Sequence, residues 1–132
     1  LLTGWTTRSA LLGIACGANF AALTVIPANG HPMTHIMWID ADDDHILVNT
    51  DLGRAKATAM NNDPRVTVAI WDAANPYRYA EVRGRVVGTT TGEEAGAHID
   101  ALAMKYTGAA YSFGSRDTRI IYRIEPIRQR GL

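Results

Sequence analysis

Two basic side chains, Arg54 and Lys56, stand at the start of a predicted helix, where they could bind an anion such as a phosphate. The segment 46–48 is apolar and β-prone, 49–53 has the composition of a turn, and 54–60 is rich in good helix formers. A helix N-terminus carries free backbone N–H groups and a partial positive charge, so it attracts phosphates. The sequence therefore predicts an anion site here. The plainer alternative is that both residues are solvated surface cations.

Two other polar patterns in the sequence could indicate metal sites. His31 and His35 are four residues apart, but Pro32 makes a helical pair of ligands implausible. The run of acidic residues over 40–44 lacks the glycine and the distal glutamate of a calcium loop, so it predicts a solvated turn. No further cluster of ligands accompanies either pattern, and we expect no metal.

The composition limits the class of protein. The chain has 132 residues, which suits a single domain over 1–132. Its 13 basic and 13 acidic residues give zero formal net charge, which argues against a nucleic-acid-binding role. Cys16 is the sole cysteine; we expect a buried, inert thiol and a cytoplasmic protein.

The segment between Arg8 and Asp40 contains no Asp, Glu, Lys or Arg, so a membrane helix or a signal peptide must be considered. Residues such as Gly13, Gly17 and Pro27 interrupt it, and no stretch reaches the roughly 20 apolar residues that a span needs. We therefore expect no membrane span but a buried helix followed by a buried strand. A secretory segment remains the alternative.

The remaining pattern alternates short strands with turns. Strands are predicted over 20–26, 33–39, 45–49, 65–71, 77–88 and 118–125. Helices are predicted over 1–18 and 54–60, and a capping box at 91–94 predicts a third helix that ends near Tyr106. No βαβ rhythm repeats. The best physical interpretation is a mainly β protein, a mostly antiparallel barrel with peripheral helices.

An ordered set of motifs resembles a known family. The set comprises Gly30-x-Pro32, Trp38, Asn49-Thr50, Gly53-Arg54-Ala55-Lys56, Asp63-Pro64-Arg65-Val66, Asn75-Pro76-Tyr77-Arg78-Tyr79, Glu81-Val82-Arg83-Gly84-Arg85-Val86, His98-Ile99-Asp100, Leu102, Lys105-Tyr106-Thr107-Gly108, Arg119, Ile121 and Pro126. It resembles the flavin and deazaflavin oxidoreductases of the pyridoxamine-phosphate-oxidase-like split β-barrel superfamily, and within them the branch that uses the deazaflavin coenzyme F-420. The resemblance covers nearly the whole chain.

The resemblance implies a six-stranded antiparallel split β-barrel and a homodimer with the cofactor in a groove at the subunit interface. It implies that Arg54 and Lys56 contact the cofactor phosphate, with Asn49 and Thr50 holding the phosphate or the ribityl chain. The segment Met33, Thr34 and His35 would lie along the ring system. Three aromatic residues would approach the cofactor, across the dimer in some cases, or else serve in core or dimer packing: Trp71, Tyr77 and Tyr79.

The implied activity is hydride transfer from a reduced deazaflavin to a small conjugated acceptor such as a quinone, a nitro compound or a tetrapyrrole. Tyr79 or His35 is a candidate proton donor. The chain departs from the usual pattern because it has Ala59, Asn61 and Asn62 where family members often have an asparagine and basic residues. A less basic groove makes FMN a competing cofactor. The alternatives are an FMN-dependent oxidase or reductase and a non-catalytic cofactor carrier.

Overall fold

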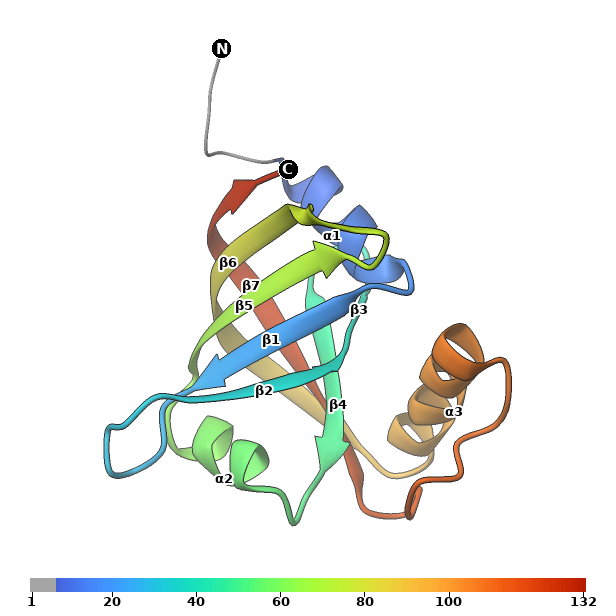
Figure 1. The fold of residues 1–132 in the computed structure, drawn as a ribbon. Coiled ribbons are helices and arrows are strands. Elements are labelled where there is room, and N and C mark those ends of the chain that lie inside the picture. Colours follow the sequence, from blue (N-terminus) through green and yellow to red (C-terminus); the bar gives the residue numbers. More distant parts are fainter. Residues whose placement is uncertain (1–6) are drawn as a thin grey trace.

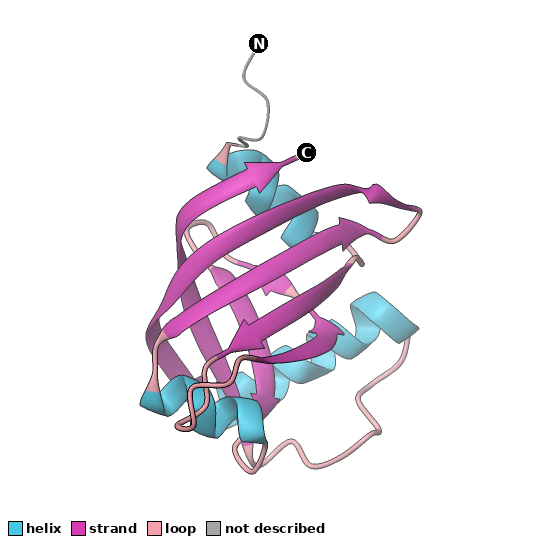
Figure 2. Ribbon diagram, turned by 60° about the vertical axis from the view of Figure 1, so that its left-hand side comes forward, coloured by secondary structure: helices cyan, strands magenta, loops and turns pink. Residues whose placement is uncertain are grey.

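The computed structural model describes residues 7–132 as one long antiparallel sheet with three helices around it (Figures 1 and 2). In chain order the elements are α1 (Arg8–Cys16), β1 (Phe20–Val25), β2 (Met33–Trp38), β3 (Asp40–Ala41), β4 (Ile46–Asp51), α2 (Ala55–Asn62), β5 (Arg65–Asp72), β6 (Asn75–Thr91), α3 (Glu93–Thr107) and β7 (Arg119–Gly131).

The strands pair antiparallel in the order β2-β1-β5-β6-β7-β4-β3, and the sheet curls on itself as a split barrel. The predicted fold class is therefore confirmed. A seventh strand, the two-residue β3, joins the six that were expected, at the start of the stretch predicted to be a loop. The strands β2 and β4 are not hydrogen-bonded neighbours, and this leaves the barrel open between them.

Alternating apolar side chains fill the barrel. Leu23, Val68 and Val82 are fully buried on three adjacent strands, as the period of two requires. Tyr122 of β7 is also fully buried, and its hydroxyl bonds the Ala57 carbonyl and Asn61 Oδ1 at 3.2 and 2.8 Å. The core therefore holds α2 at the lower end of the barrel in Figure 1, with its N-terminus fixed beside the opening.

The strands β6 and β7 run further than predicted. The prediction ended the last strand at Glu125, where its alternation of apolar and polar residues stops. In the structure Pro126 stands opposite Gly84, at a register shift between Arg83 and Gly84, and the strand continues to Gly131. A Cβ on Gly84 would lie 2.6 Å from Ile124 Cγ2, so the bend depends on glycine.

Two helix predictions need correction. The predicted helix 1–18 is described from Arg8 to Cys16, and residues 1–6 lie outside the described part. Its Leu11 and Ile14 are buried, but Cys16 is exposed because it falls on the outer side of the last turn; the predicted buried thiol is wrong. The predicted capping box is also wrong: α3 begins after Gly92, at φ 76°, without a side-chain cap.

Among the described helices, none has the length and apolarity to cross a membrane.

Candidate functional site

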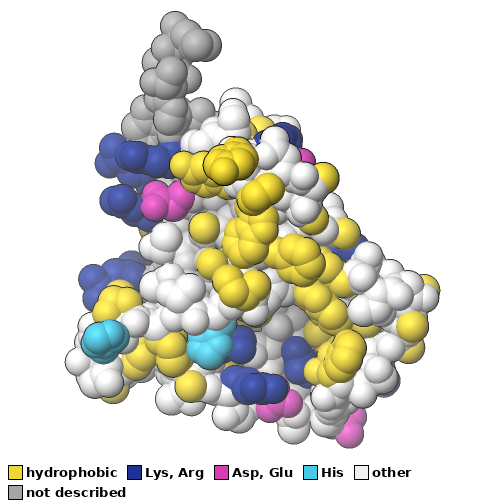
Figure 3. Space-filling model, viewed as in Figure 1, with side chains coloured by type: hydrophobic (Ala, Val, Ile, Leu, Met, Phe, Trp, Pro, Cys, Tyr) yellow, Lys and Arg dark blue, Asp and Glu magenta, His cyan; other side chains and the backbone are white. Residues whose placement is uncertain are grey.

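The opening of the barrel forms a cavity of about 490 Å³, within the range of small-molecule sites. It lies between β2, β4, the start of α2, α3 and the loop before β7. The lining residues are His35, Ile36, Met37, Trp38, Asn49, Thr50, Arg54, Lys56, Ile99, Leu102, Tyr111, Phe113 and Arg119. Figure 3 shows basic side chains and a histidine gathered around a hollow beneath a band of hydrophobic side chains.

Three cations converge on this cavity: Arg54, Lys56 and Arg119. Arg54 is the N-cap residue of α2, which has no side-chain cap; the Ala57 and Thr58 N–H groups donate to the Arg54 carbonyl, so the N–H groups of Ala55 and Lys56 are the ones left for a ligand. Burial, and then the charges of Arg54 and Arg119, lower the pKa of Lys56. Within residues 7–132 none of the three cations pairs with a carboxylate, and none of the described lining residues is acidic. The hydrogen bond from Thr118 and, less strongly, the charges of Arg119 and Arg54 lower the pKa of Asp51, but that carboxylate lies outside the cavity lining, so the cavity itself is suited to an anion.

His35 of β2 faces the same cavity. Its Nε2 atom is buried and has no hydrogen-bond partner among the described residues. Burial, and then the charges of Lys56 and Arg54, lower the pKa of His35, which favours the neutral ring. A neutral imidazole with a buried unsatisfied nitrogen is suited to a hydrogen bond with a bound ligand.

Arg119 is 9 % exposed and rigidly held, although it carries a full charge. Its Nε donates to Asn49 Oδ1 at 2.9 Å, and a terminal nitrogen donates to the Asn49 carbonyl at 3.4 Å. Its other terminal nitrogen donates to the Tyr111 hydroxyl at 3.3 Å, and the guanidinium lies 5.2 Å from the centre of the Tyr111 ring. These contacts fix the plane of the guanidinium at the cavity wall.

Aromatic rings form a further part of the cavity wall, which adjoins Arg119 through Tyr111. Trp38 stacks on Tyr106 with ring centroids 5.1 Å apart and an interplanar angle of 4°. Phe113 meets Trp38 edge-on at 6.2 Å and Tyr111 at 5.8 Å, and it is 72 % exposed. Aromatic rings and a cluster of cations in the same cavity fit a ligand that has both a flat ring and an anionic group.

The structure brings together five of the predicted site residues. His35, Asn49, Thr50, Arg54 and Lys56 all line the cavity, although they come from β2, β4 and α2. The side chain of Asn49 is occupied by protein partners, so within this cavity it holds other residues in place.

The other predicted residues lie elsewhere in this chain. Met33 lines a separate cavity beside α2, and Thr34 is exposed with its hydroxyl 2.8 Å from that of Thr24. Trp71 of β5 packs on Phe20 of β1, which stands between Trp71 and Trp38 in the sheet. Tyr77 and Tyr79 are 91 % and 49 % exposed on β6, where Tyr79 pairs with Trp71.

Sequence reasoning missed Arg119, Trp38, Tyr111 and Phe113 as site residues. Arg119 alternates with apolar neighbours on its strand, so the period of two placed it on a solvent-facing side. Tyr111 and Phe113 lie in a loop of irregular form, for which no periodicity gives a direction. Within residues 7–132, no three His, Cys, Asp or Glu side chains gather as a metal site would require.

The fold and the site together define a split β-barrel of the kind that binds flavin or deazaflavin cofactors. The sequence model of the pyridoxamine 5'-phosphate oxidase family matches residues 12–129, and the chain belongs to that family. The donor set agrees with such a cofactor, because it combines unpaired cations, an orphaned imidazole nitrogen and an aromatic wall. A search of curated proteins finds no match.

Solved structures share the fold. An F-420 reductase superposes with a TM-score of 0.79 at 23% identity, over 98% of both chains. A conserved hypothetical protein from Mycobacterium tuberculosis gives 0.73 at 20% identity, over 98% of this chain and 86% of that one. General Stress Protein 26 from Bacillus anthracis gives 0.68 at 20% identity, over 89% and 86%. At these identities the solved structures establish the architecture only. The reaction has to be inferred from the residues of the site.

Proposed function

We propose that this protein is a coenzyme F-420-dependent reductase that transfers a hydride to a small conjugated organic acceptor. The observation that carries the proposal is the convergence of Arg54, Lys56 and Arg119, none of which forms an ion pair within residues 7–132, with aromatic rings in one cavity. The similarity in fold to an F-420 reductase supports the choice of cofactor.

The chain's own residues divide the work of binding. Arg54, Lys56 and the N-terminal N–H groups of α2 would hold the cofactor phosphate, and Arg119 adds a third positive charge. The ring would lie along β2 near His35 and Trp38. The bound cofactor supplies the hydride, and the protein orients ring and acceptor and excludes water.

His35 is the better placed of the two candidate proton donors. Burial, and then the charges of Lys56 and Arg54, lower the pKa of His35, so it would carry the proton only once a bound anion offsets those charges. Its Nε2 lies buried at the cavity without a described partner, whereas Tyr79 is half exposed on β6, three strands from β2 in the sheet. Tyr79 could reach a cofactor only if a second subunit brought it there. His35→Ala should therefore slow turnover more than Tyr79→Phe, unless the proposed dimer places Tyr79 at the cofactor.

FMN is the second candidate, and α2 supplies the observation that favours it. Beyond Lys56 the helix carries no further cation. Two of the positions that follow are Ala59, which is buried, and Asn61, which bonds Tyr122. The site thus gathers enough charge for one phosphate, and FMN ends at a single phosphate, whereas the F-420 tail adds carboxylates.

A second copy of this chain is the proposed partner. A cavity of about 460 Å³ on another face, between β1, β5, β6 and β7, is lined by apolar side chains, among them Ile26, Val66 and the 62 % exposed Ile127, and by three arginines, Arg65, Arg83 and Arg85. Packing a second subunit there would remove this apolar surface from water. Sedimentation should give the mass of a dimer, and Ile127→Glu should give that of a monomer. A monomeric wild type contradicts this assignment.

A turnover experiment separates the candidates. Reduced F-420 is mixed with the protein and a quinone acceptor, and the return of the absorbance of oxidised F-420 is followed. A reductase oxidises the cofactor only when acceptor is present, and Arg54→Ala slows the reaction at low cofactor concentration. The same assay with reduced FMN measures the competing activity. Binding of F-420 with no acceptor-dependent oxidation, over a panel of quinones and nitro compounds, identifies a carrier and refutes the reductase.

A further inference from the structure

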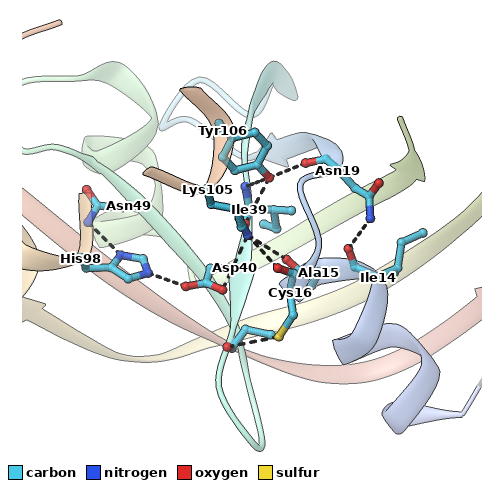
Figure 4. Close-up of polar contacts among 11 residues, drawn as sticks. Ile14, Ala15, Cys16, Asn19, Ile39, Asp40, Asn49, His98, Lys105 and Tyr106 are labelled. Carbon is cyan, nitrogen blue, oxygen red and sulfur yellow. Dashed lines mark hydrogen bonds and ion pairs between the residues drawn. The ribbon is translucent and has the colours of Figure 1, made fainter. Parts of the chain in front are cut away.

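A line of hydrogen bonds leads from the cavity into the interior. Arg119 Nε donates to Asn49 Oδ1 at 2.9 Å, Asn49 Nδ2 lies 3.0 Å from His98 Nδ1, and His98 Nε2 lies 2.9 Å from Asp40 Oδ2. Figure 4 shows the Asn49, His98 and Asp40 side chains joined in sequence. His98 is not among the described residues that line the cavity, so it can act on the site only through Asn49.

The groups at the ends of this line determine which atom donates and which atom accepts in each of its hydrogen bonds. A guanidinium only donates, so Asn49 must turn its oxygen toward Arg119. The Ala95 carbonyl only accepts, and Asn49 Nδ2 donates to it at 3.0 Å. The second Nδ2 proton then points at His98 Nδ1, which must present a lone pair. The neutral His98 ring therefore carries its proton on Nε2 and donates it to Asp40.

Asp40 is a firm anchor for this line. Burial raises the pKa of Asp40, but the hydrogen bonds from His98 and the Ala41 N–H and the charge of Lys105 outweigh burial and leave that pKa lowered. Lys105 Nζ lies 3.7 Å from Asp40 Oδ1 and donates to the Ile39 carbonyl at 2.6 Å. The carboxylate is thus ionised and held in place, ready to accept the His98 proton.

We propose that His98 is a positioning residue that acts through Asn49 to aim Arg119 at the bound anion. The assignment rests on the proposed function in so far as that anion is the cofactor phosphate. Asn49 is 5 % exposed, so its amide has no water to compensate for a lost partner. Without an acceptor at His98 Nδ1, one Nδ2 proton of this buried amide has no partner, and only the bonds to Arg119 and to the Ala95 carbonyl still hold the amide, so Asn49 fixes Arg119 less firmly.

Glutamine at position 98 is the conservative replacement. Its oxygen can accept from Asn49 and its NH₂ can donate to Asp40, whereas leucine can do neither. The matched control is His45→Gln, because His45 also pairs with an aspartate, Asp42, with Nδ1 3.1 Å from Oδ1, away from the cavity. If His98 served only in packing, the effects of His98→Gln and His98→Leu would not follow the ability of the new side chain to form hydrogen bonds.

The first measurement uses the wild-type protein without ligand. Proton–nitrogen correlation spectra of its histidine rings at pH 7.5 (roughly one pH unit above the ordinary histidine pKa) should assign the Nε2–H tautomer to His98. The signal is identified by its loss in His98→Gln. A ring protonated on Nδ1, alone or together with Nε2, overturns the proposal. This result depends neither on cofactor binding nor on the folding of a leucine variant.

The second measurement compares the variants. In His98→Leu the Arg119 Nε–H should exchange faster with water, and the Kd for F-420 and for FMN should rise about tenfold, the effect of one weakened charge-assisted bond. His98→Gln and His45→Gln should stay within about twofold of the wild type on the same scale. Wild-type affinity and exchange in His98→Leu refute the positioning role. If the wild type binds neither cofactor, the proposed function fails, and the tautomer and the Arg119 exchange still decide this inference.

Discussion

The replacement of Lys56 by methionine should stabilise the ligand-free protein and weaken cofactor binding at the same time. Lys56 is half buried between two cations, and its pKa is lowered by burial and then by Arg54 and Arg119. Its charge therefore destabilises the folded state throughout the neutral range. That destabilisation disappears only as the pH rises past the lowered pKa toward the ordinary value of 10.5.

The magnitudes follow from the surroundings of the side chain. Repulsion between partly exposed like charges is screened, so its removal should add about 0.5 kcal/mol to the free energy of unfolding and about 2 °C to the Tm. A hydrogen bond from an ammonium to a phosphate contributes about 1.5–3 kcal/mol, so the Kd should rise at least tenfold. Opposite signs for stability and affinity are typical of a binding site that holds unneutralised charge.

The matched control is the second buried lysine of the chain. Burial also lowers the pKa of Lys105, but its Nζ donates to the Ile39 and Cys16 carbonyls at 2.6 and 3.1 Å and lies beside Asp40. Lys105→Met leaves these acceptors unsatisfied and should destabilise the protein by about 3 kcal/mol. Thermal and urea unfolding measure both variants. A lower Tm for Lys56→Met, or an unchanged cofactor Kd, refutes the reasoning.

Three further outcomes test other parts of the structure. Lys56→Met should raise the pKa of His35, which is lowered first by burial and then by Lys56 and Arg54; titration of the ring protons by NMR measures it, and no change would remove His35 from this cluster. Hydrogen bonds from Arg65 lower the pKa of Asp63 from 3.8 to about 2, so their stabilisation is complete above 3.8 and lost as the pH falls to about 2; acid unfolding of Asp63→Asn should differ from the wild type above this window and converge with it below. Tyr122→Phe should lower the free energy of unfolding by about 1–2 kcal/mol in urea, because its two bonds to α2 are lost, and an unchanged value would mean that packing alone holds that helix.

Local signals predicted the start of α2 and its two cations, Arg54 and Lys56. A strand, a turn and a run of helix formers follow one another within 46–60, and each is visible without knowledge of distant contacts. The resemblance added Asn49, Thr50 and His35, and all five residues line the cavity. The barrel itself was predictable because strand alternation and hairpin spacing persist along the chain.

The remaining residues depend on contacts far apart in the sequence. Asp40 was predicted to lie in a solvated turn, but α3 brings His98 and Lys105 against it and makes it part of the interior. Asp42 does form the expected turn, because its partners, the N–H groups of Asp44 and His45, are neighbours in the chain. Arg119 reaches the cavity only through its bond to Asn49, 70 residues earlier.

The most direct test of the account is a fluorescence titration of the purified protein with F-420 and, separately, with FMN. Arg54→Ala and Lys56→Ala serve as site variants, and Arg8→Ala, which removes a cation that donates to the Pro126 carbonyl away from the cavity, serves as the control. We predict binding of F-420 in preference to FMN by the wild type and by Arg8→Ala, and binding at least tenfold weaker in each site variant. A preference for FMN would move the protein to the flavin branch. Equal affinity in the site variants, or no binding of either cofactor, would contradict the central claim.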